Sequence, residues 1–177
     1  RKAAMRIAFA RQDAALGQSA AARENMAQAN ALLAGIGSQR LDSARLERRV
    51  ALAQLAVGSD LLASGSFDDA LKTLRPSLAS LERRAAADPK NIDSQRDLSL
   101  AANAVGDALL AKGQIDEALQ RYREALAIRD RLVKRDPKND AWRRDLSVSQ
   151  ERVGDVLLAK AELDEALNAY RRSLDLR

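Results

Sequence analysis

Residues 105–119 read VGDALLAKGQIDEAL, and nearly the same stretch occurs at 57–71 as VGSDLLASGSFDDAL and at 153–167 as VGDVLLAKAELDEAL. The glycines near the start of these stretches, Gly58, Gly106 and Gly154, are 48 residues apart. A constant period of this length is typical of chains built from stacked supersecondary units, each of which packs on its neighbours. We therefore expect function on a repeated surface rather than in a catalytic cleft.

Each unit is predicted to be a helical hairpin. Apolar residues recur at helical spacing over residues 98–111 and again over 115–126. Gly113 lies where the first helix should end, and Asp116 and Glu117 fall in the first turn of the second, where negative charge complements the helix dipole. The chain has only 3 prolines and 8 glycines, too few for the turns of an all-β fold. The fold class is therefore all-α.

The boundaries between units lie at residues 88–91 and 136–139, which both read DPKN. Proline ends the preceding helix there, and asparagine can cap the next. We predict repeats over 41–88, 89–136 and 137–177, the last shortened in its second helix. Residues 1–40 form either a degenerate first repeat or lead-in helices. Their agreement with the 48-residue register is restricted to a few positions, Gly17, Ala22 and Met26, and their boundary is Gly35-Ile36-Gly37 instead of DPKN.

The conserved positions within these units resemble the tetratricopeptide repeat (TPR). The second unit has Gly106 and Leu109, followed by Ala118 and an aromatic residue, Tyr122, and the third unit repeats the pattern. The first unit has Leu74 in place of the aromatic residue. The family repeat has 34 residues, and the 14 extra residues here divide into two helical turns per helix, which keeps each apolar position on its face.

The resemblance implies an α-solenoid of stacked antiparallel helical hairpins, a TPR-like superhelix, in a long-repeat variant of the kind found in bacterial multidomain signalling proteins. With the added turns, each helix should have about 20 residues and a length of about 30 Å.

The resemblance also implies a site, because the first helix of each TPR hairpin lines a concave groove. Family members that bind a peptide carboxylate use Lys, Arg and Asn at positions three before and one after the small residue. The corresponding residues here are Leu55, Ser59, Asn103, Asp107, Glu151 and Asp155. The clamp is therefore missing, and the carboxylates would repel a peptide C-terminus. We expect a protein or peptide partner with basic or neutral polar side chains.

A row of arginines, Arg48, Arg96 and Arg144, lies two helical turns before these positions. The row could bind phosphate or carboxylate groups bidentately. The interpretation that the sequence favours is a ladder of salt bridges with neighbouring Asp97 or Asp145, and ligand binding is the alternative. The candidate partner-binding residues of the concave face are Arg48, Ser59, Arg96, Asn103, Asp107, Arg144, Glu151 and Asp155.

Three further repeated arginines and the tryptophan are expected to have structural roles. Arg75, Arg123 and Arg171 each follow the core aromatic position by one residue and should face solvent. Trp142 has no equivalent in the other units and should pack on a neighbouring helix, or else anchor a partner.

Composition argues against enzymatic function. The chain has no cysteine and no histidine, and it has no phosphate-binding GxxxxGK[ST] motif. We expect no catalytic, cofactor or metal site. No apolar run reaches the roughly 18 residues that a membrane-spanning helix needs. The absence of cysteine fits a reducing compartment, so a cytoplasmic location is expected.

The function that the sequence favours is a protein-interaction scaffold, one module of a larger multidomain bacterial protein. The chain begins at Arg1 without an initiator methionine, which suggests a fragment, and exposed terminal repeats could form a homodimer. The alternative is a basic helical repeat that binds nucleic acid or another polyanion, since the net charge is +5. Interleaved carboxylates and an aromatic content of 3% count against nucleic acid.

Overall fold

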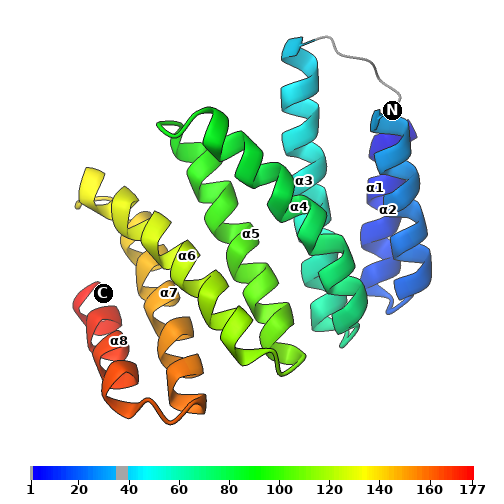
Figure 1. Ribbon diagram of the computed structural model, residues 1–177. Helices are drawn as coiled ribbons and strands as arrows, with labels where there is room; N and C mark the ends of the chain where they lie inside the picture. Colours follow the sequence, from blue (N-terminus) through cyan, green and yellow to red (C-terminus); the bar gives the residue numbers. More distant parts are fainter. Residues whose placement is uncertain (1, 35–39) are drawn as a thin grey trace. The chain divides into compact units, whose positions relative to one another are not determined.

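The structure, a computed structural model, describes residues 2–34 and 40–177, and every regular element in these two ranges is an α-helix (Figure 1). The prediction of an all-α fold is confirmed. The Gly35-Ile36-Gly37 boundary lies outside the described residues. The helices are α1 (Lys2–Ala15), α2 (Ser19–Ala34), α3 (Arg40–Ala63), α4 (Phe67–Ala87), α5 (Ile92–Ala111), α6 (Ile115–Arg135), α7 (Asp140–Ala159) and α8 (Leu163–Asp175).

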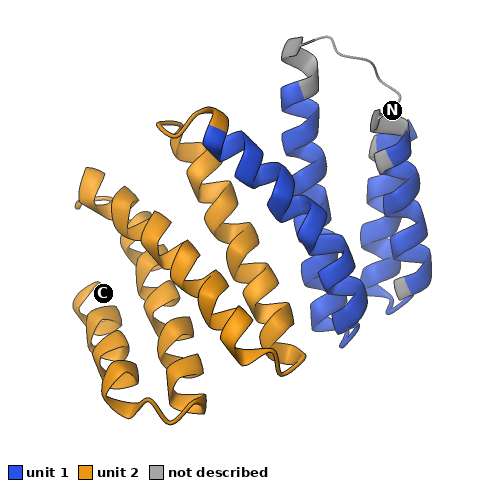
Figure 2. Ribbon diagram, viewed as in Figure 1, with its two compact units in different colours: residues 1–86 blue, residues 87–177 orange. Residues whose placement is uncertain are grey.

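The chain divides into two compact units, residues 1–86 and residues 87–177 (Figure 2). In the first unit α1 packs on α2 and on α3, and α4 packs on α3, where the Ser77 hydroxyl donates to the Ala51 carbonyl at 2.7 Å. The first hairpin buries Ala22 and Met26, which are 0% and 3% exposed and occupy the expected register positions. In the second unit α5 packs on α6, α6 on α7, and α7 on α8.

The turn inside each hairpin has the same backbone geometry in all four pairs. Residues 17, 65, 113 and 161 have φ angles of 72°, 79°, 75° and 60°, and they are spaced 48 residues apart. The next residue returns its N–H to the carbonyl five positions earlier, as Gln114 does to Leu109 at 2.9 Å. This is the Schellman arrangement that ends a helix with a left-handed residue. Three of the four positions are glycine, and the fourth, Ala161, holds a strained conformation.

The DPKN connectors of the second unit work as the sequence predicts. The Asn91 side chain accepts a hydrogen bond from the Ser94 N–H at 2.9 Å, and the Asn139 side chain accepts one from the Trp142 N–H at 3.1 Å. These N-caps start α5 and α7. The helices α5, α6 and α7 then run for 20, 21 and 20 residues, which confirms the expected helix length.

The small residue of each repeat allows two helices to approach closely. A Cβ atom added to Gly106 would lie 2.6 Å from Cε1 of Tyr122, and one added to Gly154 would lie 2.8 Å from Cε1 of Tyr170. Contacts this short do not occur between real carbon atoms, so only glycine fits the observed packing. The first unit has the same arrangement, with Gly58 facing Leu74.

Candidate protein-interaction surface

A groove in the second unit is lined mainly by residues of α5 and α7, together with Tyr122 of α6. Its volume is about 320 Å³, and its lining is mixed in charge and polarity: Asp107, Leu110, Tyr122, Val148, Glu151, Arg152 and Asp155. Three of the sequence-predicted site residues, Asp107, Glu151 and Asp155, therefore meet in one groove. Three carboxylates face a single guanidinium among the lining side chains.

Asp107 is engaged by two partners inside the groove. It accepts a hydrogen bond from the Tyr122 hydroxyl at 2.7 Å and forms an ion pair with Arg152, whose guanidinium lies 5.9 Å from the centre of the Tyr122 ring. Burial and the Asp107 carboxylate both raise the pKa of Tyr122. Burial opposes the charge of Arg152, but the hydrogen bond and the charge of Asp107 outweigh it, and the pKa of Arg152 is raised. The charge of Asp107 is thus offset within the protein.

Asp155 is exposed, and it accepts a hydrogen bond from the neutral Tyr170 hydroxyl at 2.7 Å. This hydrogen bond, with smaller contributions from burial and the carboxylate charge, raises the pKa of Tyr170 to about 12. Glu151 accepts a hydrogen bond from Ser173 at 3.0 Å and forms an ion pair with Arg177. Because its hydrogen-bonding partner is neutral, Asp155 is the carboxylate of the groove best placed to meet an external cation.

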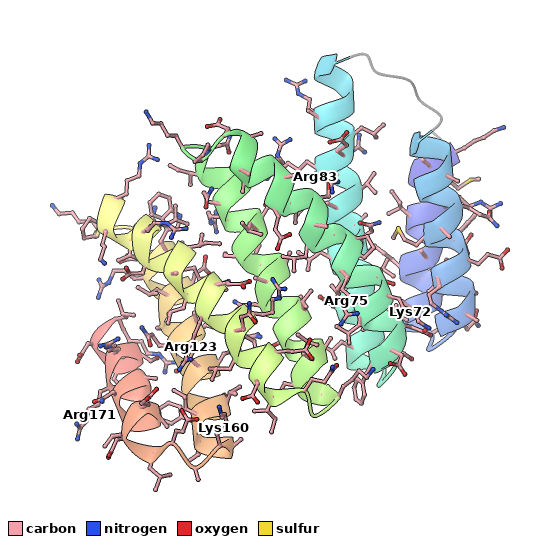
Figure 3. The ribbon with its side chains drawn as sticks, in the orientation of Figure 1. Lys72, Arg75, Arg83, Arg123, Lys160 and Arg171 are labelled. Carbon is pink, nitrogen blue, oxygen red and sulfur yellow. The ribbon has the colours of Figure 1, made fainter. Side chains whose placement is uncertain are left out.

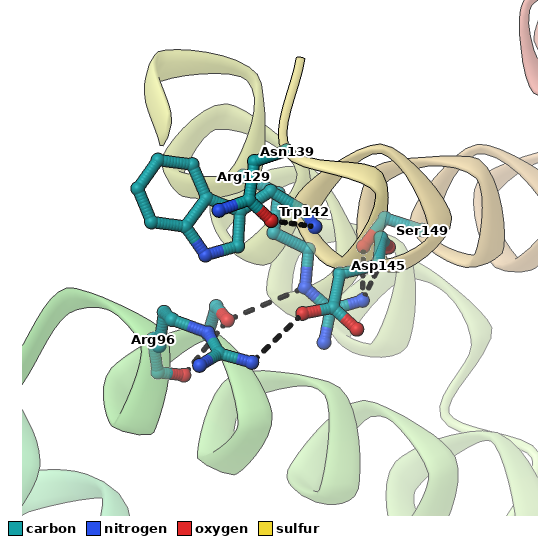
Figure 4. Close-up of polar contacts among 7 residues, drawn as sticks. Arg96, Arg129, Asn139, Trp142, Asp145 and Ser149 are labelled. Atoms are coloured by element: carbon teal, nitrogen blue, oxygen red, sulfur yellow. Dashed lines mark hydrogen bonds and ion pairs between the residues drawn. The ribbon is translucent and has the colours of Figure 1, made fainter. Parts of the chain in front are cut away.

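Asn103 lies in the interior rather than on the groove surface. It is 5% exposed, and with its amide oxygen turned toward Arg129 it accepts from both terminal nitrogens of that guanidinium, at 3.1 and 3.2 Å. Arg129 is itself 5% exposed. It also donates to the Asp145 carbonyl at 2.7 Å, to Ser149 at 2.9 Å and to Ser99 at 3.3 Å (Figure 4). Burial lowers the pKa of Arg129.

The arginine row does not form a uniform set. Arg96 pairs with Asp145 at 3.5 Å, which is the salt bridge that the sequence offered as an alternative to ligand binding (Figure 4). Arg144 is exposed and lines a second pocket of about 610 Å³. Arg48 and Ser59 belong to the first unit, where Arg48 is half-buried and the exposed Ser59 donates to its own helix at the Leu55 carbonyl. Neither is among the residues that line the groove.

The sequence pattern did not indicate Arg152, which lines the groove, or Arg129, which is buried with Asn103. A signal for Arg129 is present in paired replacements between repeats. Where the second unit has Asp107 and Tyr122 the first has Ser59 and Leu74, so the carboxylate and the phenol change together. A second pair of positions also changes together. The first repeat has Leu55 and Leu81 there, the second has Asn103 and Arg129, and the third has Glu151 and Arg177.

The remaining repeated arginines face solvent, as predicted. Arg75, Arg123 and Arg171 are all exposed (Figure 3), and Arg123 forms a surface ion pair with Glu165 at 3.4 Å. Trp142 is half-buried at the start of α7.

Residues 2–34 and 40–177 contain no group of three or more His, Cys, Asp or Glu side chains arranged to hold a metal ion. None of the helices in these ranges combines the length and the apolar character needed to span a bilayer.

Consecutive helical hairpins with a common turn and a common glycine contact define the class: this is an all-helical repeat protein with the TPR-like fold. Among solved structures it is similar to BtubC (BKLC) from P. vanneervenii, with a TM-score of 0.66 and 21% identity over 91% of this chain. The chain spans 57% of the length of BtubC. It also matches a Podosopora anserina chain described as a kinesin light chain with nearly identical TPR-like repeats, with a TM-score of 0.35 and 16% identity over 97% of this chain and 93% of the other. No protein-family model and no curated protein sequence matches the chain.

Proposed function

We propose that the chain is a protein-interaction scaffold that binds a peptide or protein partner in the groove between α5 and α7. The observation that carries the proposal is the exposed Asp155 carboxylate in a groove of about 320 Å³ whose lining also includes the apolar residues Leu110 and Val148. A basic side chain could place its charge on Asp155, and an adjacent apolar side chain could contact the apolar part of the lining. The groove thus fits a segment with lysine or arginine next to an apolar residue.

The groove does not favour a terminal carboxylate as ligand. Its one lining cation, Arg152, is already paired with Asp107, and the neighbouring acidic side chains would repel a second anion. The alternative function, polyanion binding by the arginine row, has less support because Arg96 of that row already pairs with Asp145 inside the second unit. We therefore propose that residues 89–136 and 137–177 act as two repeats of one binding module, within the four-part division of the chain expected from the sequence.

An array of short synthetic peptides that differ in their content of lysine, arginine and glutamate tests the proposal. Basic peptides should bind, their affinity should fall as salt is added, and amidation of the C-terminus should not weaken them. The variant Asp155→Asn keeps an acceptor for Tyr170 but removes the charge. It should weaken binding by a factor of roughly two to five, as expected for a partly exposed ion pair.

The matched control is Asp164→Asn, which removes the same charge from an exposed position in the first turn of α8, outside the groove lining. It should leave peptide affinity unchanged. A preference for acidic peptides, equal effects of the two variants, or salt-sensitive binding of single-stranded RNA in place of peptides would contradict the proposed function.

A further inference from the structure

Each of the two helices that line the groove has an apolar residue two turns before its aspartate. Leu100 lies seven residues before Asp107 on α5, and Val148 lies seven residues before Asp155 on α7. Both aspartates and Val148 line the groove. Seven residues are close to two helical turns, so each apolar residue shares a helix face with its aspartate and lies about 10 Å from it along the helix axis.

Leu100 and Val148 lie at the same level of α5 and α7. The two helices run in the same direction, because each packs against α6 and is joined to it by a short connection. Arg96 of α5 pairs with Asp145 of α7 at 3.5 Å (Figure 4). Leu100 follows Arg96 by four residues and Val148 follows Asp145 by three, so both lie about one turn beyond this ion pair. We call these two residues the apolar row.

Leu100 is exposed with its neighbouring helices of the second unit in place. It is 44% exposed, whereas Leu109 on the same helix is 2% exposed. Helix α5 packs against α6 and is linked to α7 by two ion pairs, so Leu100 does not lie at an uncovered edge of this unit. A ligand that covers the exposed part of a leucine gains about as much affinity as it gains from a surface ion pair.

The aspartates of the groove differ in what they offer to a ligand. Asp107 is already paired with Arg152, whereas the hydrogen-bonding partner of Asp155 is the neutral Tyr170 hydroxyl. The groove therefore fits one basic side chain, at Asp155. A second strong contact with the ligand has to be apolar, and the apolar row is the surface available for it two turns away.

The size of the groove favours an extended ligand over a helical one. An extended chain rises about 3.3 Å per residue, so three residues cover the distance of about 10 Å between Asp155 and the apolar row. A helix would need seven residues for the same distance, and two turns of a helix about 10 Å wide occupy roughly 800 Å³. The groove has a volume of about 320 Å³.

We infer that the groove binds an extended segment of a partner protein in which a lysine or arginine is three residues from a large apolar residue. The basic side chain pairs with Asp155, and the apolar side chain covers Leu100 and Val148. This inference rests on the proposed function and adds to it a second contact, Leu100, and the spacing of the ligand.

The test uses short labelled peptides of glycine and serine that contain one lysine and one leucine. The separation of these two residues is varied from one to seven, in both orders, and binding to the full chain is measured by fluorescence anisotropy at low salt. In one of the two orders, a separation of three should bind roughly three- to tenfold more tightly than the other separations.

The variant Leu100→Ala locates the apolar contact. It should weaken the peptide with a separation of three roughly three- to tenfold, and it should leave a peptide that lacks the leucine unchanged. A merely structural role of Leu100 would affect both peptides alike. The matched control is Leu16→Ala, which truncates a leucine that is 63% exposed in the first unit and should not change affinity. Circular dichroism should show the same helix content for both variants.

The inference and the proposed function fail in different ways. If basic peptides bind and Asp155→Asn weakens them, but Leu100→Ala has no effect or the separation does not matter, the inference is overturned and the proposed function stands. Tightest binding at a separation of seven would overturn the extended conformation of the ligand. If no basic peptide binds, or if Asp155→Asn and Asp164→Asn have equal effects, both proposals are overturned.

Discussion

The buried pair of Asn103 and Arg129 gives the most demanding test of the packing described above. The first unit has Leu55 and Leu81 at the equivalent positions, and Leu81 is 0% exposed. A hairpin of this type therefore accepts either two apolar side chains or a hydrogen-bonded polar pair. We expect each single replacement in the second unit to be costly and the double replacement to be less costly than the sum.

The magnitudes follow from the groups left without partners. Arg129→Leu removes the donor to the buried Asn103 amide oxygen, and a buried acceptor without a donor costs about 1–3 kcal/mol. The Asp145 carbonyl keeps its donor within α7, and relief from burying a charge offsets part of the cost, so a net loss of about 1–2 kcal/mol is expected. Asn103→Leu removes one acceptor from the guanidinium and should cost about 1–2 kcal/mol. In the double variant the two positions should be coupled by about 1–2 kcal/mol.

The assay is urea unfolding of the full chain followed by circular dichroism, with a double-mutant cycle over the four proteins. Arg123→Leu is the matched control, because this arginine lies on the same helix but is 54% exposed, and it should change stability by less than about 0.5 kcal/mol. Additive losses in the cycle, or no loss from Arg129→Leu alone, would refute the argument that these two side chains satisfy each other.

Three further predictions concern single positions. The pKa of Tyr170 is about 12 in the folded chain against an ordinary 10.0, so the stability from its hydrogen bond to Asp155 should persist below pH 10 and be lost between pH 10 and 12, as followed by phenolate absorbance and by unfolding at each pH. Gly106→Ala places a Cβ 2.6 Å from Tyr122 and should cost about 1–3 kcal/mol in urea unfolding. Ala161→Gly relieves a φ of 60° and should raise stability by about 1 kcal/mol, measured as a higher melting temperature.

Local features of the fold could be predicted from the sequence because each has a local cause. The position of Gly113 after an apolar helical run predicts the end of a helix, and Gly113 follows α5 with a positive φ. Asn91 and Asn139 could be identified as caps from the preceding proline and the following helix. Each of these features depends on residues close together in the chain.

The groove was predicted less completely because its contacts join residues far apart in the chain. The spacing of the repeat predicts Asn103 on the groove lining, whereas in the structure it is 5% exposed and its amide faces the buried Arg129 guanidinium. The sequence pattern does not indicate that Asp107 pairs with Arg152, which is 45 residues further along the chain. The ion pair depends on how α5 and α7 approach each other, which a one-dimensional pattern does not specify.

The polar pairs of the second unit have a consequence for how such a chain can evolve. Asp107 with Tyr122 and Asn103 with Arg129 are each contained within one hairpin. Recombination at the DPKN connectors would keep these two pairs intact, whereas a crossover in the turn at Gly113 would separate both. Exchange of a whole hairpin would still break the contacts that join it to the next hairpin, such as Arg96 with Asp145 and Asp107 with Arg152, unless the new neighbour supplied the same partners.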